Sequence, residues 1–341
     1  MGLEQLLGFS DRNLTPDEVR GNLEFDGRHI RSVINDTRFD IGEFEFVSLH
    51  ELRKRVEDES VNHISESEPK QSIVNHTAPA REDVADYIRD PDYQHAMFQV
   101  ASQFNLLEMA SPNMTPEHGI DVYWHDYTQG PACARATIGA TLYRNYFVEF
   151  EGRVGQIASV QLNGLDDALR CIGIAQGDDY IYENGYIRLS KSQLKRASDR
   201  IQSMSESERI DLMGEVKVGI HWGCQVNDHD GPIDQYVSTI FCSGLPLGYY
   251  ARGGVTTGDA EALGRLVQDA MQEATILATT LNSFRYGNRC VVLTKLGCGV
   301  FGNPIDWVVD ARNRALDNNP VPVEALQFHY SEREPEFDYG G

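Results

Sequence analysis

The sequence is poor in basic residues, with 30 Lys and Arg against 52 Asp and Glu and a net charge of −22. A surface that binds duplex nucleic acid needs clustered Lys and Arg, because the phosphates are anionic. We therefore expect no nucleic-acid partner. Apolar runs of transmembrane length are also lacking, and the first residues show no basic-then-apolar signal pattern. These absences favour a cytoplasmic protein with no membrane partner.

Patterns for metal ions and disulfides are missing as well. None of the six cysteines forms a Cys-x-x-Cys pair or has the spacing of a zinc site, so we expect reduced thiols, no metal and no cofactor. His118 with His125, or His221 with His229, could in principle hold an ion. Each pair lacks a third ligand, and isolated histidines are more often structural.

The most informative stretch runs from Val291 to Pro304. A short apolar run is followed by three glycines, Gly297, Gly299 and Gly302, and then by a helix-like segment at 306–316. Strand, glycine loop and helix form the layout that presents consecutive backbone N–H groups to an anion. The alternative is a tight strand-to-helix turn that binds nothing.

A second helix start lies near Thr128. Pro131 suits the first turn of a helix, which we expect to continue to about Phe147. Its N-terminus, at Gln129–Pro131, is another place suited to a phosphate. If this helix start and the one at Gly302–Pro304 face the same site, together they suit a diphosphate.

Polar residues follow a predicted buried strand at 97–102. In open α/β sheets, ligands gather at the carboxyl ends of strands, which makes Asn105 and Glu108 candidates for the site. Amides and carboxylates such as these, together with Asp126, can pair with sugar hydroxyls and base amino groups. Asn105 could instead fix a turn, and Asp126 could cap a helix or a turn.

The chain divides by composition into three parts. Residues 1–90 are polar and predict an accessory region, residues 91–330 predict an α/β core, and residues 331–341 predict a mobile acidic tail. Within the core we expect a right-handed βαβ unit made of a strand at 237–242, a helix at 260–281 and a strand at 290–294.

Several segments resemble a known family. Leu296–Asn303 resembles the second phosphate-binding loop of macrodomains, especially those of the poly(ADP-ribose) glycohydrolase kind. Other segments are similar to a narrower, MavL-like group of arginine-specific ADP-ribosyl hydrolases, one of which acts on ubiquitin; they are Val100–Met109, Asp126–Ala132, Arg144–Phe147 and Phe241–Pro246. The resemblance extends from about residue 40 to about residue 330.

The resemblance implies a three-layer α/β/α fold with a mixed central sheet and an ADP-ribose site at the strand ends. It places Phe104, Asn105 and Glu108 against the ligand. It places Asp126, Gln129 and Gly130 in the loop that faces the released ribose. The glycine loop would wrap the diphosphate, and Phe301 would pack on a ribose. The loop residues are Gly297, Cys298, Gly299, Val300, Phe301, Gly302 and Asn303.

The chain departs from the family pattern at two places that concern catalysis. Trp222–Gln225 stands where an acidic residue and a threonine are expected after His221. Thr128–Pro131 lacks the paired glutamates that follow a glycine run in the glycohydrolases. A helix N-terminus could lower the pKa of Cys298, but we interpret this residue as a small apolar filler rather than a nucleophile.

These patterns predict an ADP-ribosyl hydrolase that cleaves the N-glycosidic bond between ADP-ribose and a protein side chain, with arginine favoured. Asp126 is the carboxylate expected to orient water or the ribose hydroxyls. Asp228, Asp230 and Asp234 are reserve carboxylates, unless they form only a solvated acidic loop. The expected partner is ADP-ribose or an ADP-ribosylated protein, ubiquitin being one candidate. The alternatives are a non-catalytic ADP-ribose reader and a purely structural domain.

Overall fold

A seven-stranded mixed sheet forms the centre of the computed structural model, which describes residues 2–63, 72–75, 83–250 and 253–328. The predicted tail at 331–341 lies outside the described residues. The first three strands pair antiparallel, and the third to the seventh pair parallel. In spatial order they are β4 (Glu43–Ser48), β11 (Lys217–Asn227), β12 (Pro232–Cys242), β6 (Met97–Ala101), β13 (Cys290–Leu293), β14 (Glu324–Gln327) and β5 (Ile73–Asn75).

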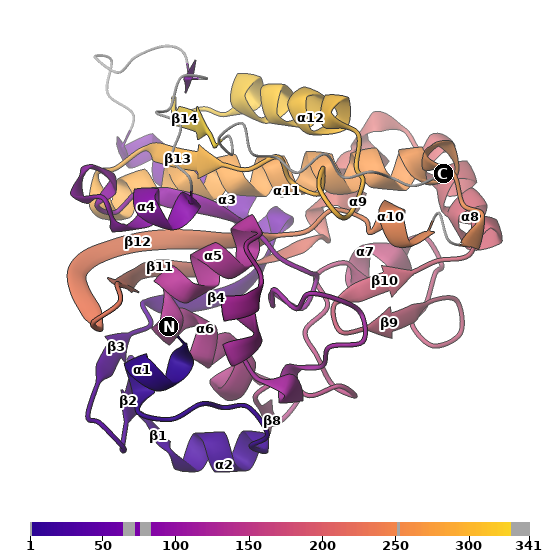
Figure 1. Cartoon of the computed structure of the whole chain (residues 1–341). Helices are drawn as coiled ribbons and strands as arrows, with labels where there is room; N and C mark the ends of the chain where they lie inside the picture. Colours follow the sequence, from indigo (N-terminus) through magenta and orange to yellow (C-terminus); the bar gives the residue numbers. More distant parts are fainter. Residues whose placement is uncertain (1, 64–71, 76–82, 251–252, 329–341) are drawn as a thin grey trace.

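Helices cover both faces of this sheet (Figure 1). Because side chains alternate along a strand, Met97 of β6 enters one core and Phe98 the other. One face packs on α3 (Leu49–His63), α7 (Asp166–Cys171), α8 (Lys191–Gln202), α9 (Glu206–Gly214), α11 (Thr257–Tyr286) and α12 (Ile305–Asn318). The other face packs on α4 (Val84–Arg89), α5 (Gln129–Ala136) and α6 (Ile138–Leu142). The predicted three-layer α/β/α architecture with a mixed central sheet is confirmed.

The N-terminal segment builds a third apolar core beneath α6. Its elements are α1 (Leu3–Leu7), α2 (Pro16–Gly21), β1 (Leu23–Phe25), β2 (His29–Ser32) and β3 (Arg38–Asp40), and they pack against the short helix η3 (Asp121–His125). Residues 1–90 also supply both edge strands of the central sheet, β4 and β5. How the chain divides into domains therefore stays a prediction.

Short elements complete the described chain. They are η1 (Pro91–Tyr93), η2 (Pro116–His118), the π-helical turn η4 (Tyr143–Phe147), β7 (Glu149–Phe150), β8 (Arg153–Val154), β9 (Ile181–Glu183), β10 (Tyr186–Arg188) and α10 (Leu247–Tyr250). The helix predicted from Pro131 to Phe147 is wrong as one unit, because the chain leaves helical geometry at Thr137, where φ is −128°. The break lets Gly139 of α6 pack closely on Phe39.

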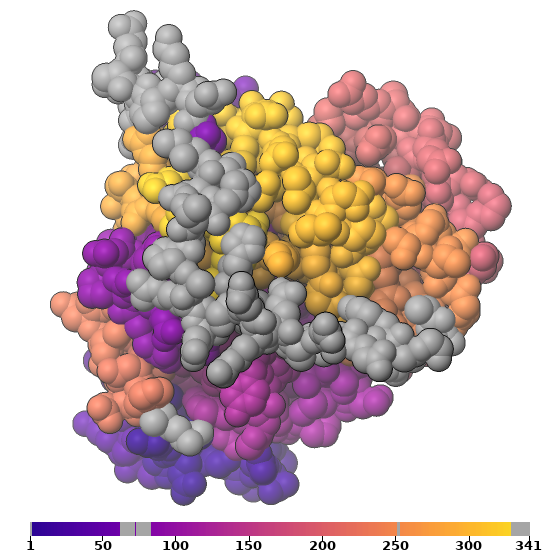
Figure 2. Space-filling view, turned by 45° about the horizontal axis from the view of Figure 1, so that its top comes forward, coloured from indigo at the N-terminus to yellow at the C-terminus, as the bar shows by residue number. Residues whose placement is uncertain are grey.

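The longest helix, α11, is the scaffold of its face. A capping box of Thr256 and Asp259 starts it, and Gly287 ends it with φ of 75°. The predicted stripe at 260–281 is confirmed, and the helix extends beyond it to Tyr286. Figure 2 shows α12 and the α8–α9 segment on the outer surface. No described helix, α11 included, is both long and apolar enough to cross a membrane.

The contact between α11 and α12 gives a test of this packing. A β-carbon on Gly264 would overlap the ring of Trp307, so we expect Gly264→Ala to lower the free energy of unfolding by about 1–3 kcal/mol. In the control Gly258→Ala, in the first turn of α11, the new methyl meets only the Thr256 hydroxyl at 3.9 Å. The control should be neutral or slightly stabilising in urea denaturation. Equal effects in both variants would contradict the packing argument.

Candidate functional site

The parallel strands β6 and β13 are neighbours whose following helices lie on opposite faces of the sheet. β6 leads to α5 on one face, and β13 leads to α12 on the other. In open α/β sheets, ligands bind outside the carboxyl ends of two strands related in this way. The topology therefore places the candidate site at the carboxyl ends of β6 and β13.

The side chain of Gln129 keeps these two strands apart. The pairing of β6 with β13 reaches only Phe98 and Val292. Beyond that point the Gln129 amide takes over the ladder: its Nε2 donates to the Gln99 carbonyl at 2.8 Å, and its Oε1 accepts from the Ala101 N–H at 2.8 Å. Gln129 is buried, and these bonds fix the N-terminus of α5 beside the strand ends.

Close packing of the α5 start on β6 requires glycine at position 130. A β-carbon there would overlap the Ala101 carbonyl oxygen. The N-cap residue, Thr128, makes no side-chain hydrogen bond to the helix. The N–H groups of Gln129 and Gly130 are therefore donors in the first helical turn that the cap does not satisfy.

The predicted glycine loop connects β13 to α12 in a tightly folded form. Gly297 and Gly302 have φ of 73° and 68°, which glycine adopts without strain. Asn303 braces the loop from inside, since its Nδ2 donates to the Leu245 carbonyl at 2.7 Å and to the Gly297 carbonyl at 3.2 Å. Gln268 of α11 donates to the other side of the same amide. Asn303 is therefore buried, and a contact between its side chain and a ligand stays a prediction.

Three consecutive backbone N–H groups in this loop remain available. Within the described residues, Gly299, Val300 and Phe301 donate no hydrogen bond, whereas Cys298, Gly302 and Asn303 donate to the loop itself. Gly299 and Val300 are exposed. Successive unpaired amides can form an anion-binding concavity, so these three groups could serve the predicted phosphate contact, which stays a prediction.

Cys298 is half-buried in this loop. Burial raises the pKa of its thiol to about 11, so the thiol is protonated near neutral pH. This supports the interpretation of Cys298 as a filler, because the thiolate is the nucleophilic form.

An aromatic cluster that the sequence analysis missed lies beside the loop. The ring of Phe301 is 5.4 Å from that of Tyr186, which is 5.2 Å from that of Tyr249. Tyr186 begins β10, and its hydroxyl donates to the Met109 carbonyl at 3.1 Å. The Asn184–Gly185 turn gave a local signal for this hairpin, but its place against residues 103–109 is set by tertiary packing.

Asp126 lies near this cluster and is only partly buried. Its Oδ1 accepts hydrogen bonds from the backbone N–H and the hydroxyl of Thr128, at 2.8 and 2.6 Å. Asp126 is therefore a turn aspartate, yet Oδ2 accepts no bond from any described residue. Burial raises the pKa of Tyr186, and the charge of Asp126 adds to the rise, so the two side chains are electrostatically coupled.

Phe104 and Asn105 follow β6 and are both buried. Phe104 belongs to the core under α11. Asn105 donates from Nδ2 to Gln161 at 2.8 Å and accepts from the Leu107 N–H at 3.1 Å, which is the turn role left open by the sequence. Ligand contact by these residues stays a prediction, and the structure gives each an internal role.

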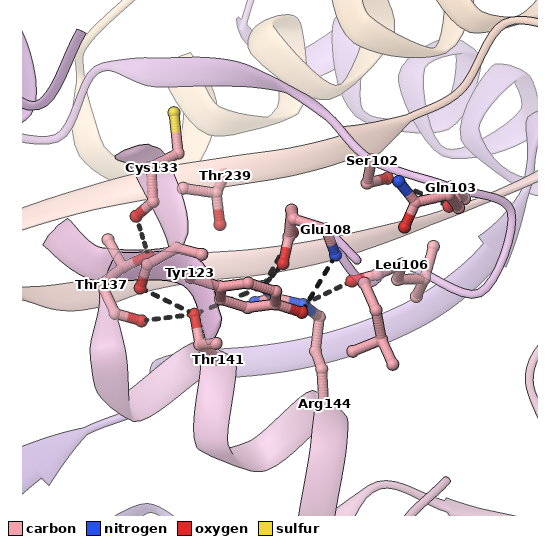
Figure 3. A network of polar contacts seen from close by, with 12 residues as sticks. Ser102, Gln103, Leu106, Glu108, Tyr123, Cys133, Thr137, Thr141, Arg144 and Thr239 are labelled. Atoms are coloured by element: carbon pink, nitrogen blue, oxygen red, sulfur yellow. Dashed lines mark hydrogen bonds and ion pairs between the residues drawn. The ribbon is translucent and has the colours of Figure 1, made fainter. Parts of the chain in front are cut away.

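Glu108 forms a buried ion pair with Arg144, a residue to which the sequence analysis gave no role (Figure 3). Arg144 Nη2 lies 3.1 Å from Glu108 Oε1, while Nε donates to the Leu106 carbonyl at 2.8 Å. The guanidinium also lies 3.7 Å from the centroid of the Phe241 ring. Burial raises the pKa of Glu108 to about 7, and Arg144 partly opposes the rise. This pair ties residues 103–109 to η4.

The reserve carboxylates lie at the opposite end of the sheet (Figure 1). Asp228 and Asp230 are in the turn between β11 and β12, and Asp234 is near the start of β12. Eleven residues of β12 separate that turn from the carboxyl end, a span of about 35 Å at ~3.3 Å per residue. The expectation that they could replace Asp126 is therefore wrong, and they form a hairpin turn.

Trp222–Gln225 also lies within β11, away from the strand ends that form the site. Trp222 is buried, and its Nε1 donates to Glu45 at 2.7 Å. His221 is buried in the same strand and bonds the Ile41 carbonyl at 2.7 Å through Nδ1. Among the described residues, no three His, Cys, Asp or Glu side chains gather closely enough to hold a metal ion.

The chain is similar to solved poly(ADP-ribose) glycohydrolases at low sequence identity. No family model matches the sequence, and no curated protein matches it. The chain is similar to the solved poly(ADP-ribose) glycohydrolase of Thermomonospora curvata, at 14% identity over 86% of this chain and 81% of that one, with a TM-score of 0.43. The Deinococcus radiodurans glycohydrolase in complex with ADP-ribose is 12% identical over 86% and 89%, also with a TM-score of 0.43. Values this low support no conclusion about the chemistry of the present chain.

The buried Glu108 gives a pH-dependent test. Its pKa rises from 4.5 to about 7 on folding, so the folded protein binds this proton more tightly than the unfolded chain. Its contribution to the free energy of unfolding is therefore present below about pH 4.5 and is lost as the pH rises to about 7. Glu108→Gln has no carboxyl group to ionise and should not show this loss. Between pH 4.5 and 7 its free energy of unfolding, measured relative to wild type, should therefore increase by an amount on the order of 3 kcal/mol.

Denaturant titrations of both proteins between pH 4.5 and 8 measure this difference. Glu183→Gln, at a partly exposed residue of β9, is the control and should keep a constant offset from wild type. A Glu108→Gln offset that is independent of pH would show that the carboxyl group stays ionised beside Arg144.

Proposed function

We propose that this chain binds ADP-ribose at the carboxyl ends of β6 and β13 and hydrolyses its N-glycosidic bond to a protein side chain. The observation that carries the proposal is the set of free amides at Gly299, Val300 and Phe301, flanked by an aromatic cluster and by Asp126. The resemblance of the same loop to the macrodomain phosphate loop supports the choice of ligand. Arginine is the modified residue that we propose.

Backbone donors explain how a strongly acidic chain could hold a diphosphate. The loop amides and the first-turn amides of α5 carry partial positive charge without any Lys or Arg. The two sets come from adjoining strand ends, since the Gln129 side chain fixes α5 to β6. Phe301 and Tyr249, which are partly exposed and pack on the buried Tyr186, offer apolar ring surface for the ribose.

The proposed reaction assigns one role to Asp126. Breaking the C1–N bond of an ADP-ribosyl-arginine builds positive charge on the ribose, and water then adds to C1. Thr128 holds Oδ1, so the free Oδ2 is the atom that would orient and deprotonate this water. The proton returns to the guanidine leaving group, so no other reactant is needed.

A reader function is the second candidate, and the turn at Asp126 favours it. The two hydrogen bonds from Thr128 already account for an aspartate at this position. A module that only binds ADP-ribose would use the same amides and the same aromatic cluster. Binding and turnover must therefore be measured separately.

The loop predicts a binding defect in Gly297→Ala. A β-carbon at φ of 73° is strained and would lie 2.9 Å from Asn303 Nδ2, so the loop should distort. We expect ADP-ribose affinity measured by calorimetry to fall at least tenfold. Gly173→Ala is the matched control, with the same φ of 73° but open space around it, and should bind normally after a similar loss of stability. No ADP-ribose-dependent rise in the wild-type melting temperature would point to a purely structural domain.

The role of Asp126 predicts a turnover defect in Asp126→Asn. Asparagine keeps an Oδ1 acceptor for Thr128 but cannot take up the proton of water. We therefore expect kcat to fall by about 10²–10⁴-fold while the Kd for ADP-ribose changes little. Release of ADP-ribose from arginine-modified proteins, ubiquitin among them, measures turnover.

Asp126→Ala, which also loses the turn, should impair both binding and turnover. Full activity of Asp126→Asn would remove Asp126 from the mechanism. Tight binding of ADP-ribose without turnover by the wild-type protein would support the reader.

A further inference from the structure

A preformed hollow lies between α1 and η3, next to Asp126 in the chain. Its volume is about 550 Å³, and α1 and η3 provide opposite walls. Asp121 accepts from the Leu3 N–H at 3.1 Å, and Arg12 Nη2 lies 3.0 Å from His125 Nε2. These contacts join segments more than 100 residues apart in sequence. The hollow therefore exists before anything binds, and its size is that of a ligand site.

The lining of the hollow reaches His125, the residue before Asp126, and contains no residue of the proposed ADP-ribose cradle. Its wall ends at His125, and Asp126 follows directly, with Cα atoms about 3.8 Å apart. Along the chain, Asp126 separates this wall from the start of α5 at Gln129. Tyr127, the next residue, is 82% exposed. The chain therefore leads from the lining of the hollow, at His125, through Asp126 to the exposed ring of Tyr127.

The chemistry of this surface suits cationic side chains. Trp124 lines the hollow with the carboxylates of Glu4 and Asp121, and indole and carboxylate groups both attract ammonium and guanidinium ions. Arg135 already lies 6.0 Å from the Tyr127 ring centroid, which is a guanidinium contact of the same kind. Arg12 is the one cation in the lining, and it is paired with Asp121 at 3.4 Å.

We propose that the hollow and Tyr127 form a docking surface for the polypeptide that carries the ADP-ribose, and that they select basic residues next to the modified side chain. The inference rests on the proposed function and names its substrate class. The net charge of −22 supports it, because an acidic surface steers a basic partner toward the site. Recognition of the leaving polypeptide is thereby separated from recognition of ADP-ribose.

The test compares two substrates that share one bond. One is free ADP-ribosyl-arginine, and the other is a peptide that carries the same group between lysine residues. Tyr127→Ala and Glu4→Lys should each lower kcat/KM for the peptide by about 5–20-fold and leave the free substrate within about twofold, because one contact of this kind is worth roughly 1–2 kcal/mol. Glu57→Lys, the same charge change at an exposed residue of α3, should alter neither rate.

The outcomes separate the two proposals. Equal losses on both substrates, or none on either, would overturn the docking surface while leaving the hydrolase intact. Replacing the lysines of the peptide by glutamine should abolish the difference between wild type and Glu4→Lys, and a difference of unchanged size would contradict selection of basic residues. If the wild-type protein released ADP-ribose from neither substrate, the proposed function itself would fail.

Discussion

The hydrogen bonds of one side-chain amide determine how the strand ends of the candidate site are arranged. The Ser102 N–H donates to the Cys242 carbonyl of β12, and the Ser238 N–H of β12 donates to the Ala96 carbonyl just before β6. Backbone groups alternate sides along a strand, so the Gln99 carbonyl and the Ala101 N–H point the other way, toward β13. There the amide of Gln129, rather than β13, completes the ladder. A buried strand cannot leave these groups unpaired without a cost of about 1–3 kcal/mol each. The same two bonds hold α5 against β6 and leave β13 free to turn into the glycine loop.

The rest of the site follows from this separation. The glycine loop folds around Asn303, which bonds Leu245 and Gly297, and this brace leaves the outer amides of the loop without partners. After β6, Arg144 of η4 donates to the Leu106 carbonyl and to the Glu108 carboxylate and so fixes this segment. In this acidic chain the candidate donors for an anion are thus on the backbone. The fully buried ion pair between Glu108 and Arg144 fixes the segment that follows β6, next to the candidate site.

Local patterns accounted for much of the architecture. Apolar runs located β6, β12 and β13, and the long stripe located α11. These succeeded because a strand or a helix depends on neighbours in sequence. Residues that join the site only through packing were missed. Tyr186, Tyr249 and Arg144 received no role from the sequence, since each reaches the site from a segment distant in sequence.

The sequence alone indicated the glycine loop, because glycine adopts without strain the positive φ angles found at Gly297 and Gly302. It also determined the α/β class, through the periods of its apolar residues. Only the tertiary structure decided which polar residues face the site. Asn105 and Glu108 turn inward to protein partners, Asp126 keeps one free carboxylate oxygen, and the aspartates near residue 230 lie at the far end of β12. Strand direction and burial set these outcomes, and both arise from contacts between segments far apart in the chain.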